Sequence, residues 1–126
     1  MPKIPNRPDI VIKRIYEPAS TDDGVRVLVD RLWPRGLTKA AAHLDLWTKD
    51  AAPSPDLRRW FGHEPERFEA FARRYTAELA ERPEAWAALL EAARQGRLTL
   101  LYAAKNPDCN HALVLQAFLQ TQLAAG

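Results

Sequence analysis

Apolar residues gather in three short runs that predict β-strands. β-Branched residues dominate the first run, which extends from Ile10 to Tyr16. The second run, Arg26 to Trp33, has an almost continuously apolar centre, and the third, Leu98 to Ala104, is apolar nearly throughout. Runs of this kind are typical of strands that are covered on both faces, as in a parallel sheet.

Prolines and capping residues mark helices between the second and third runs and after the third. Apolar residues recur at helical spacing after Pro65 and again after Pro83. Ser54 is a good N-cap, and Pro55 suits the first position of a helix. The sequence thus predicts weak helical structure over 40–46, a short helix over 56–61, longer helices beginning at Pro65 and Pro83, and a final helix capped by Asp108 or Asn110.

This order of elements predicts an α/β fold. We expect a small single-domain sheet within residues 1–126, with at least one parallel βαβ crossover and helices packed on its faces. The link between the second and third strands is long enough for a right-handed crossover. The link between the first and second is short for a parallel connection, so the first strand is expected to be antiparallel or at an edge. Pro2, Pro5 and Pro8 predict an extended arm over residues 1–9.

Composition and charge narrow the class of protein more than its function. The formal net charge of +2 is too small to indicate nucleic-acid binding by itself. Most of the 18 basic residues are arginines, which bind carboxylate and phosphate well but also commonly solvate a surface. The N-terminal residues lack the apolar run of a signal peptide, and no segment approaches the ~18 apolar residues that span a bilayer. We therefore expect a cytoplasmic protein without membrane contact; the pattern gives no oligomeric state.

Motifs for the common cofactors and metals are absent from the sequence. The five glycines are scattered, so no P-loop or dinucleotide-binding turn is expected. The three histidines and the single cysteine, Cys109, show no zinc-ligand spacing, which leaves only a site assembled from distant residues. No Gly-x-Ser-x-Gly nucleophile elbow is present. We therefore predict no metal site and assign no cofactor.

The polar segment that follows the second strand, Asp30 to Gly36, is the first candidate site. In open α/β sheets, ligands bind outside the carboxyl ends of the strands. Charged groups are costly there unless they pair or bind a ligand. Asp30 is therefore a candidate acid–base or orienting residue, and Arg31 and Arg35 are candidates for gripping an anion. The alternative is an internal Asp–Arg pair that locks the loop.

The segment after the third strand is the second candidate site. Tyr102 to Lys105 lead into the final helix, which is expected to begin near Asn110 and His111. The N–H groups of a helix N-terminus attract anions, and its dipole favours a neutral imidazole that can act as a base. The alternative is that Asn110 only caps the helix and His111 packs against its neighbours.

Three segments of the chain form specific motifs. They are Val-Leu-Val-Asp-Arg-Leu-Trp-Pro-Arg-Gly at 27–36, Ala-Pro-Ser-Pro-Asp-Leu-Arg-Arg-Trp-Phe-Gly-His at 52–63, and Leu-Leu-Tyr-Ala-Ala-Lys at 100–105 with Asn-His-Ala at 110–112. Together they resemble the YeaO-like proteins, a branch of the domain of unknown function 488 family, and the similarity runs over about residues 12–119. The resemblance implies an α/β fold and a bacterial or archaeal cytosolic protein, and it supplies no established activity.

The resemblance to the broader family also implies two polar segments, Asp-x-Arg after the second strand and Cys-His-Arg after the last. Asp30 and His111 stand at the corresponding places. Here an arginine directly follows Asp30, Asn110 stands at the cysteine position, and Ala112 replaces the arginine. Cys109 is therefore not the family cysteine, which weakens any thiol mechanism.

Two classes of function follow from these residues. In the first, a small anionic ligand (phosphorylated, nucleotide-like or carboxylated) binds at the carboxyl ends of the strands, and the protein is an enzyme if Asp30 and His111 provide acid–base groups. This hypothesis predicts that the two polar segments meet, with Asp30 and His111 close together in one pocket. In the second, surface arginines and aromatic residues form a nucleic-acid or protein-binding module. A blander alternative is that all the polar residues are internal locks of a scaffold. The candidates are Asp30 and His111 for catalysis, Arg31, Arg35, Lys105 and Asn110 for anion binding, and Tyr102, Arg58 and His63 as further site residues.

Overall fold

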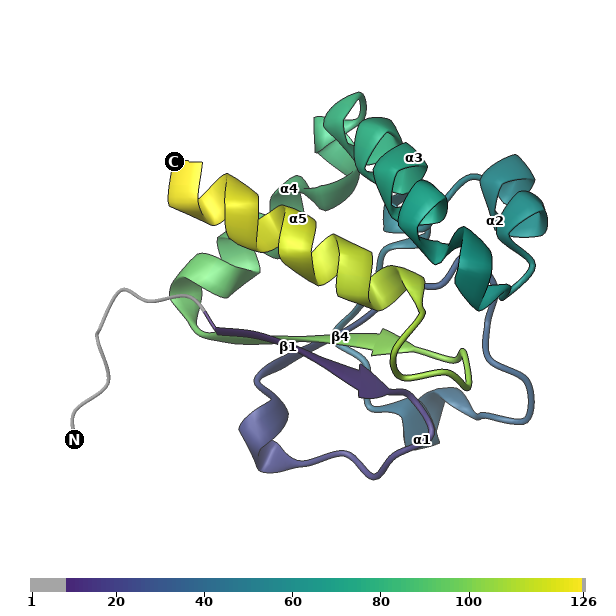
Figure 1. The fold of residues 1–126 in the computed structure, drawn as a ribbon. Helices are drawn as coiled ribbons and strands as arrows, with labels where there is room; N and C mark the ends of the chain where they lie inside the picture. The colour runs from purple at the N-terminus through teal and green to yellow at the C-terminus, as the bar shows by residue number, and fades with distance from the viewer. Residues whose placement is uncertain (1–8, 126) are drawn as a thin grey trace.

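A four-stranded parallel sheet forms the centre of the structure, with most helices stacked on one of its faces (Figure 1). The structure is a computed structural model that describes residues 9–125. The strand order is β1-β4-β2-β3, and every neighbouring pair is parallel. The predicted α/β class with parallel crossovers is therefore confirmed. The strands are β1 Asp9–Arg14, β2 Val25–Leu28, β3 Leu46–Trp47 and β4 Arg97–Tyr102.

The helices begin where the sequence places good caps. Ser54 Oγ accepts a hydrogen bond from the Leu57 backbone N–H, and Pro55 occupies the first turn of α2. Asn110 Oδ1 accepts from the Leu113 N–H at the start of α5, so Asn110 and not Asp108 caps the final helix. The described helices are α1 Lys39–Ala42, α2 Pro55–Phe61, α3 Phe68–Ala80, α4 Pro83–Gln95 and α5 His111–Ala125, with 3₁₀ helices η1 Thr21–Asp23, η2 Lys49–Ala51 and η3 Pro65–Arg67. No helix among residues 9–125 is both long enough and apolar enough to cross a bilayer.

Alternating side chains of the central strands enter two separate cores. Val27, Leu98 and Leu100 pack with the buried faces of α2 to α5 in the larger core. Leu28 and Leu101 point to the opposite face, where α1 and the loop after β2 cover a smaller core. Because both faces of β2 and β4 are buried, these strands read as continuous apolar runs.

Two predicted strands differ from the observed ones in neighbour or length. The first strand lies at an edge, as one of the two alternatives stated, and it is parallel to β4. The antiparallel alternative came from the short link between the first two strands, which is too short for a parallel connection between neighbours. In the structure β1 and β2 are not neighbours, because β4 lies between them. The second strand was predicted to reach Trp33 but ends at Leu28, because side chains replace its backbone pairing after Val29, as described below.

Three further differences concern short elements. The weak helical segment 40–46 resolves into the single turn α1 and, at Leu46, the start of β3. With only two residues, β3 is too short to produce an alternating pattern. The helix predicted to begin at Pro65 starts with the 3₁₀ turn η3 and becomes α-helical at Phe68. Asp9, assigned to the arm, belongs to β1, and the rest of the predicted arm lies outside the described residues.

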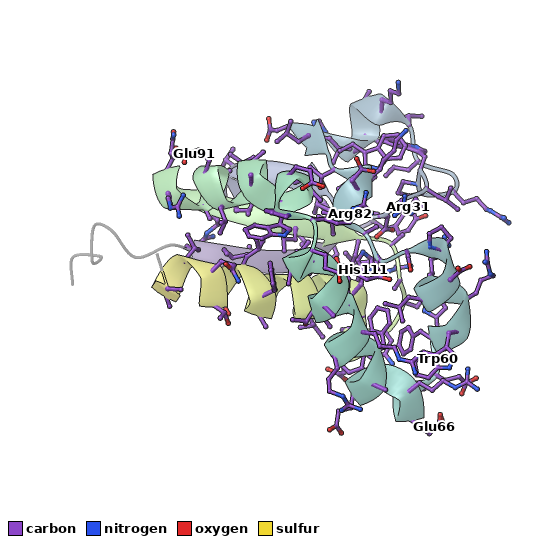
Figure 2. The ribbon with its side chains drawn as sticks, turned by 90° about the horizontal axis from the view of Figure 1, so that it is seen from above. Arg31, Trp60, Glu66, Arg82, Glu91 and His111 are labelled. Atoms are coloured by element: carbon purple, nitrogen blue, oxygen red, sulfur yellow. The ribbon has the colours of Figure 1, made fainter. Side chains whose placement is uncertain are left out.

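Viewed from above, the candidates Arg31 and His111 lie toward the same end of the sheet (Figure 2). Arg31 and His111 lie beside α2 and α3, whereas Glu91 of α4 lies at the other end of the molecule. This asymmetry follows from the parallel sheet, because the carboxyl ends of all its strands share one edge.

Gly24 gives a direct test of the turn that enters β2. Its backbone has φ +66° and ψ −134°, and a Cβ at this position would lie 2.2 Å from the Arg97 carbonyl oxygen. We expect Gly24→Ala to lower the free energy of unfolding by about 2 kcal/mol or more, since it adds a steric overlap to backbone strain. Gly36→Ala is the matched control, because Gly36 also has positive φ (+76°) but nothing lies within 4 Å of its added Cβ. Equal losses for the two variants in urea denaturation would contradict this account.

Candidate functional site

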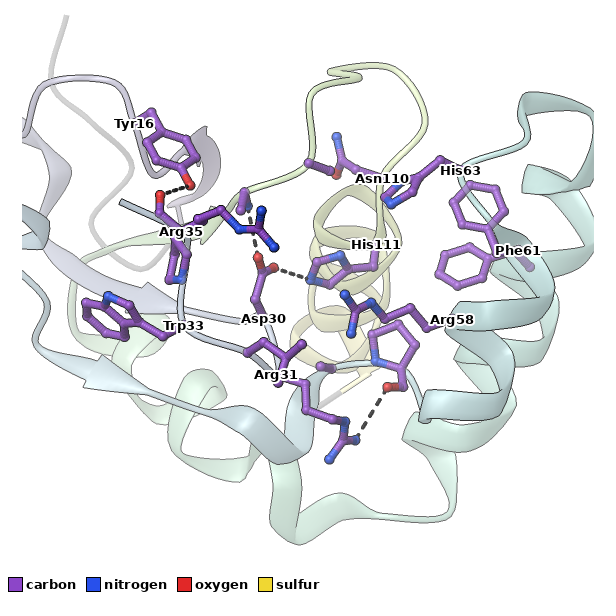
Figure 3. A pocket seen from close by; sticks show the side chains of 17 residues that line it. Tyr16, Asp30, Arg31, Trp33, Arg35, Arg58, Phe61, His63, Asn110 and His111 are labelled. Atoms are coloured by element: carbon purple, nitrogen blue, oxygen red, sulfur yellow. Dashed lines mark hydrogen bonds and ion pairs between the residues drawn. The ribbon is translucent and has the colours of Figure 1, made fainter. Parts of the chain in front are cut away.

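A cavity of about 370 Å³ opens at the carboxyl ends of β2 and β4 (Figure 3). Its walls come from the loop after β2, the residues after β4, the start of α5, and α2. The two polar segments that were expected to meet, one after each strand, therefore do meet. Its polar lining consists of Tyr16, Asp30, Arg31, Arg35, Arg58, His63, Asn110 and His111.

Asp30 and His111 contact each other at the base of this cavity. His111 Nε2 lies 3.0 Å from Asp30 Oδ1 and 3.1 Å from the Val29 carbonyl oxygen. Both side chains are largely buried, with exposed fractions of 16% for Asp30 and 15% for His111. Since both neighbours of Nε2 are acceptors, this nitrogen carries a proton and donates it.

These two side chains replace one backbone hydrogen bond between β2 and β4. Val29 N–H donates to the Leu101 carbonyl, which continues the β2–β4 register by one step. In a parallel ladder the next bond would run from the Ala103 N–H to the Val29 carbonyl. Instead, Ala103 N–H donates to Asp30 Oδ2 at 3.0 Å, and the Val29 carbonyl accepts from His111. The two strands therefore separate at this point without leaving these backbone groups unpaired.

Three arginines surround the pair, and they are held differently. The guanidinium groups of Arg35 and Arg58 extend toward Asp30 and His111 from opposite sides (Figure 3). Among residues 9–125, neither guanidinium has an ion pair or a hydrogen bond. Arg31 turns away to the Pro53 carbonyl, at a long 3.4 Å, and its Nε is buried without a hydrogen-bond partner in the described chain.

The loop that carries Arg35 is pinned at three points. Trp47 Nε1 donates to the Asp30 carbonyl at 2.7 Å, and Trp33 Nε1 donates to the Leu37 carbonyl at 2.6 Å. The Tyr16 hydroxyl donates to the carbonyl of Arg35 itself at 2.8 Å. The backbone of this arginine is thus fixed, which lowers the entropy that would be lost on binding a ligand.

The helix that carries Arg58 is tied to α3. Glu78 of α3 accepts hydrogen bonds from the Ser54 backbone N–H at 2.9 Å and from its hydroxyl at 2.5 Å. At the other end of α2, Gly62 and His63 both adopt left-handed backbone conformations, with φ of +54° and +59°. A positive φ is uncommon for a non-glycine residue such as His63. The turn places His63 at the wall of the cavity.

The remaining predicted residues occupy other positions. Asn110 lines the cavity, but its amide is already engaged, with Nδ2 donating to the Asn106 carbonyl and Oδ1 capping α5. Lys105 is exposed and does not line the cavity. Tyr102 packs in the larger core, where burial raises the pKa of its phenol above the usual value.

Aromatic residues of the wall were not identified from the sequence. Phe61 and Phe71 stack at 4.3 Å between ring centroids and both line the cavity, and Tyr16 reaches it from the end of β1. Tyr16 was detectable in principle, since it follows a strand whose carboxyl end lies at the same edge. The two phenylalanines carry no such signal, because helical spacing marks them only as core residues.

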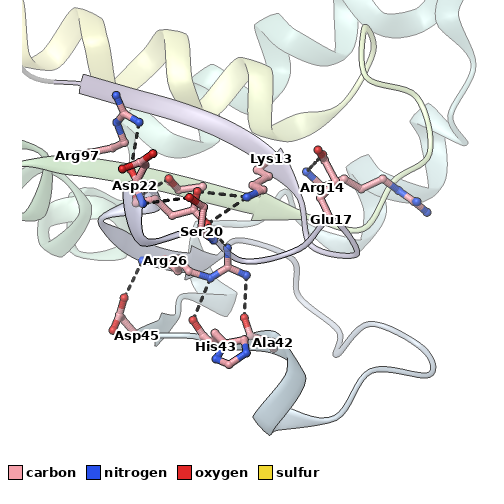
Figure 4. A network of polar contacts seen from close by, with 12 residues as sticks. Lys13, Arg14, Glu17, Ser20, Asp22, Arg26, Ala42, His43, Asp45 and Arg97 are labelled. Atoms are coloured by element: carbon pink, nitrogen blue, oxygen red, sulfur yellow. Dashed lines mark hydrogen bonds and ion pairs between the residues drawn. The ribbon is translucent and has the colours of Figure 1, made fainter.

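A second cluster of charged groups lies away from the cavity and is fully paired (Figure 4). Asp23 accepts from Lys13 Nζ at 3.2 Å, from the Ser20 N–H at 3.0 Å and from Arg26 Nη1. The Arg26 guanidinium also donates to the carbonyls of Ala42 and His43. Burial alone raises the pKa of Asp23, but the Ser20 backbone bond and the cations Lys13 and Arg26 outweigh it, so this pKa lies below its ordinary value.

No group of three His, Cys, Asp or Glu side chains within residues 9–125 is arranged to hold a metal ion. The cluster of charged residues around Asp23 at η1 is fully paired, whereas the cluster at the cavity contains two guanidinium groups, those of Arg35 and Arg58, that have no partner within residues 9–125.

Comparison with known proteins gives a family and several bacterial relatives. The family model described as the inactive DUF488-N3 subclade matches residues 9–126. The uncharacterized protein YeaO of Escherichia coli K12 is 46% identical over 113 residues, which cover 90% of this chain and 98% of that protein. The uncharacterized protein Rv3073c of Mycobacterium tuberculosis H37Rv is 43% identical over 108 residues, covering 86% and 91%. No solved structure matches this chain.

A substitution at Asp30 tests whether its carboxylate replaces the backbone hydrogen bond between β2 and β4. We expect Asp30→Ala to lower the free energy of unfolding by about 1–3 kcal/mol, because the partly buried Ala103 N–H then loses its acceptor. Asp30→Asn is the matched control, since its amide oxygen can still accept from Ala103, and it should cost less. Urea denaturation measures both, and an Asp30→Ala variant as stable as the parent would contradict the bracing role.

Asp23 offers a test by pH. Its lowered native pKa means that it stabilises the fold above the unfolded pKa of about 3.9 and that this contribution is lost as the pH falls through the native value. Stability should therefore fall on acidification below about pH 5, and less so in Asp23→Asn. At pH 7 that variant should lose about 3–5 kcal/mol, because the buried Arg26 loses its partner. Glu91→Gln, which affects an exposed pair with Arg94, should change stability by less than about 1 kcal/mol.

Proposed function

Since this chain belongs to the inactive DUF488-N3 subclade of the domain of unknown function 488 family, we propose that it binds a small anionic ligand without converting it. The ligand occupies the cavity at the carboxyl ends of β2 and β4. Arg35 and Arg58 hold its negative charge, and Asp30 with His111 supports the cavity from beneath. The sequence departures at Asn110 and Ala112 agree with a member that keeps the site but not the chemistry.

The observation that carries the proposal is the pair of cavity-lining guanidiniums without partners. Elsewhere in residues 9–125, several arginines that face solvent on the helices pair with nearby acids, as Arg59 does with Asp56 and Arg94 with Glu91. At the cavity, three arginines face a single carboxylate, and that carboxylate is already engaged. The volume also falls within the range of about 300–1,000 Å³ that small-molecule sites occupy.

The positions of Asp30 and His111 favour support over acid–base catalysis. A general base has to come within hydrogen-bond reach of the proton that it removes. Asp30 Oδ1 is buried beside His111, and Oδ2 accepts from the Ala103 backbone. His111 Nε2 likewise donates inward, to the Val29 carbonyl. Both groups are thus committed to backbone atoms of the sheet.

A nucleic-acid or protein-binding surface, the alternative from the sequence, has less support. The prominent aromatic of the α2–α3 surface is Trp60 (Figure 2), which does not line the cavity. Arg67 and Arg74 stack on it at 5.4 and 4.3 Å from its ring centroid. These arginines are therefore already engaged within the chain, and acids of the same helices balance much of the remaining charge.

A thermal-shift screen with small organic phosphates and carboxylates tests the proposal. A ligand that binds the native state raises the melting temperature. We expect at least one such anion to stabilise the parent protein, and Arg35→Gln or Arg58→Gln to weaken its binding about tenfold or more, because a hydrogen bond to a charged group contributes about 1.5–3 kcal/mol.

Two controls separate this site from a general effect of charge. Arg59→Gln removes the neighbouring arginine of α2, which pairs with Asp56 and does not line the cavity. Lys105→Gln removes a cation near the end of β4 that also does not line it. Both should leave binding unchanged. The proposal is wrong if no small anion stabilises the protein, or if all four variants lose binding equally.

A further inference from the structure

We propose that the ligand is the dianion of a phosphate monoester, held between Arg35 and Arg58 with its organic group against the phenylalanine wall. This inference rests on the proposed function and makes it more specific. It concerns which class of anion the cavity selects, and it can fail while anion binding itself stands.

The first argument is charge. Arg31, Arg35 and Arg58 line the cavity, and Asp30 is the only carboxylate among its lining residues. The three arginines and the one carboxylate together give the lining an excess of two positive charges. A carboxylate ligand supplies one negative charge, whereas a phosphate monoester carries about −1.5 to −2 at pH 7. The dianion comes closer to neutralising the site.

The second argument is direction. A carboxylate presents two oxygens in one plane, which suits the fork of a single guanidinium. Here two guanidiniums approach the same part of the cavity from opposite sides, one from the loop after β2 and one from α2 (Figure 3). The three terminal oxygens of a tetrahedral phosphate point in different directions, so they can serve both arginines at once. The 15-residue helix α5 also begins at this cavity, and the partial positive charge of its N-terminus adds to the attraction.

The third argument is the apolar wall. Phe61 and Phe71 line the side of the cavity that α2 and α3 form, with Ala52 and Pro53 beside them. Free phosphate has no group that would contact such a surface. A monoester with a planar or apolar organic group satisfies both halves of the cavity, whereas inorganic phosphate satisfies only the charged half.

Calorimetric titration with four probes tests these arguments separately. Phenyl phosphate has the proposed charge, shape and ring; benzenesulfonate keeps the ring and the tetrahedral oxygens but has one charge; benzoate is planar; and inorganic phosphate lacks the ring. At pH 7.5 we expect phenyl phosphate to bind about tenfold or more tightly than each of the others. Arg35→Gln and Arg58→Gln should each remove most of this preference, and Arg59→Gln should leave it intact.

The pH dependence gives an independent arm. The second pKa of a phosphate monoester is about 6, so its dianion falls roughly tenfold between pH 7 and pH 5. Any change in the charge of the cavity itself over the same range affects the binding of every anion. Benzenesulfonate is a monoanion throughout, so the ratio of the two affinities isolates the titration of the phosphate. We expect that ratio to fall about tenfold from pH 7 to pH 5.

The outcomes distinguish failure of the phosphate monoester inference from failure of the proposed anion binding. If benzoate or benzenesulfonate binds as tightly as phenyl phosphate, or the ratio does not change with pH, the phosphate inference is wrong and anion binding stands. If inorganic phosphate binds as tightly as phenyl phosphate, the role of the phenylalanine wall is wrong. If none of the four probes binds and the wider screen also finds no ligand, both the inference and the proposed function fall.

Discussion

The separation of β2 from β4 after Val29 sets the position of everything at the cavity. At this point the ladder would continue from the Ala103 N–H to the Val29 carbonyl, but the Asp30 carboxylate takes the donor and the His111 imidazole takes the acceptor. An unpaired buried backbone group costs about 1–3 kcal/mol, so a sheet can open in this way only if side chains satisfy both halves of the lost bond. Because one of these side chains belongs to the loop after β2 and the other to α5, they also fix where that loop and that helix begin.

The same contacts give Asp30 and His111 a structural role that does not depend on any reaction at the cavity. Asp30 and His111 stand where the resemblance to the broader family places functional groups, yet both Asp30 oxygens and His111 Nε2 are engaged where the sheet opens. The cavity lies where β2 and β4 separate, and this separation needs Asp30 and His111 to pair the backbone groups of Ala103 and Val29. Asp30 and His111 therefore have a structural role in the sheet, whereas Asn110 caps α5 and Ala112 does not line the cavity.

Sequence reasoning found the meeting of the two segments because it depends only on topology. Buried parallel strands end at one edge, and the polar residues after them must share it. Sequence reasoning failed where the outcome depends on the direction in which a side chain points. Lys105 comes three residues after the end of β4, much as Asp30 comes two residues after the end of β2, but Lys105 is exposed and outside the cavity. The end of β2 at Leu28 also could not be predicted, since the apolar run continues and only the competition from Asp30 and His111 stops the pairing.

The unpaired arginines follow from the same constraint. Asp30 is the acid nearest to Arg35 and Arg31 in sequence, and an ordinary surface would let it pair with one of them. Here the sheet already uses both of its oxygens, one for Ala103 and one beside His111. The positive charge of the rim is left without an internal counter-charge, while Tyr16 and the tryptophans of the loop prevent the backbone from moving away. Opening the ladder thus produces the cavity and leaves the guanidiniums of Arg35 and Arg58 without an internal counter-charge, which is the feature on which the proposed anion binding rests.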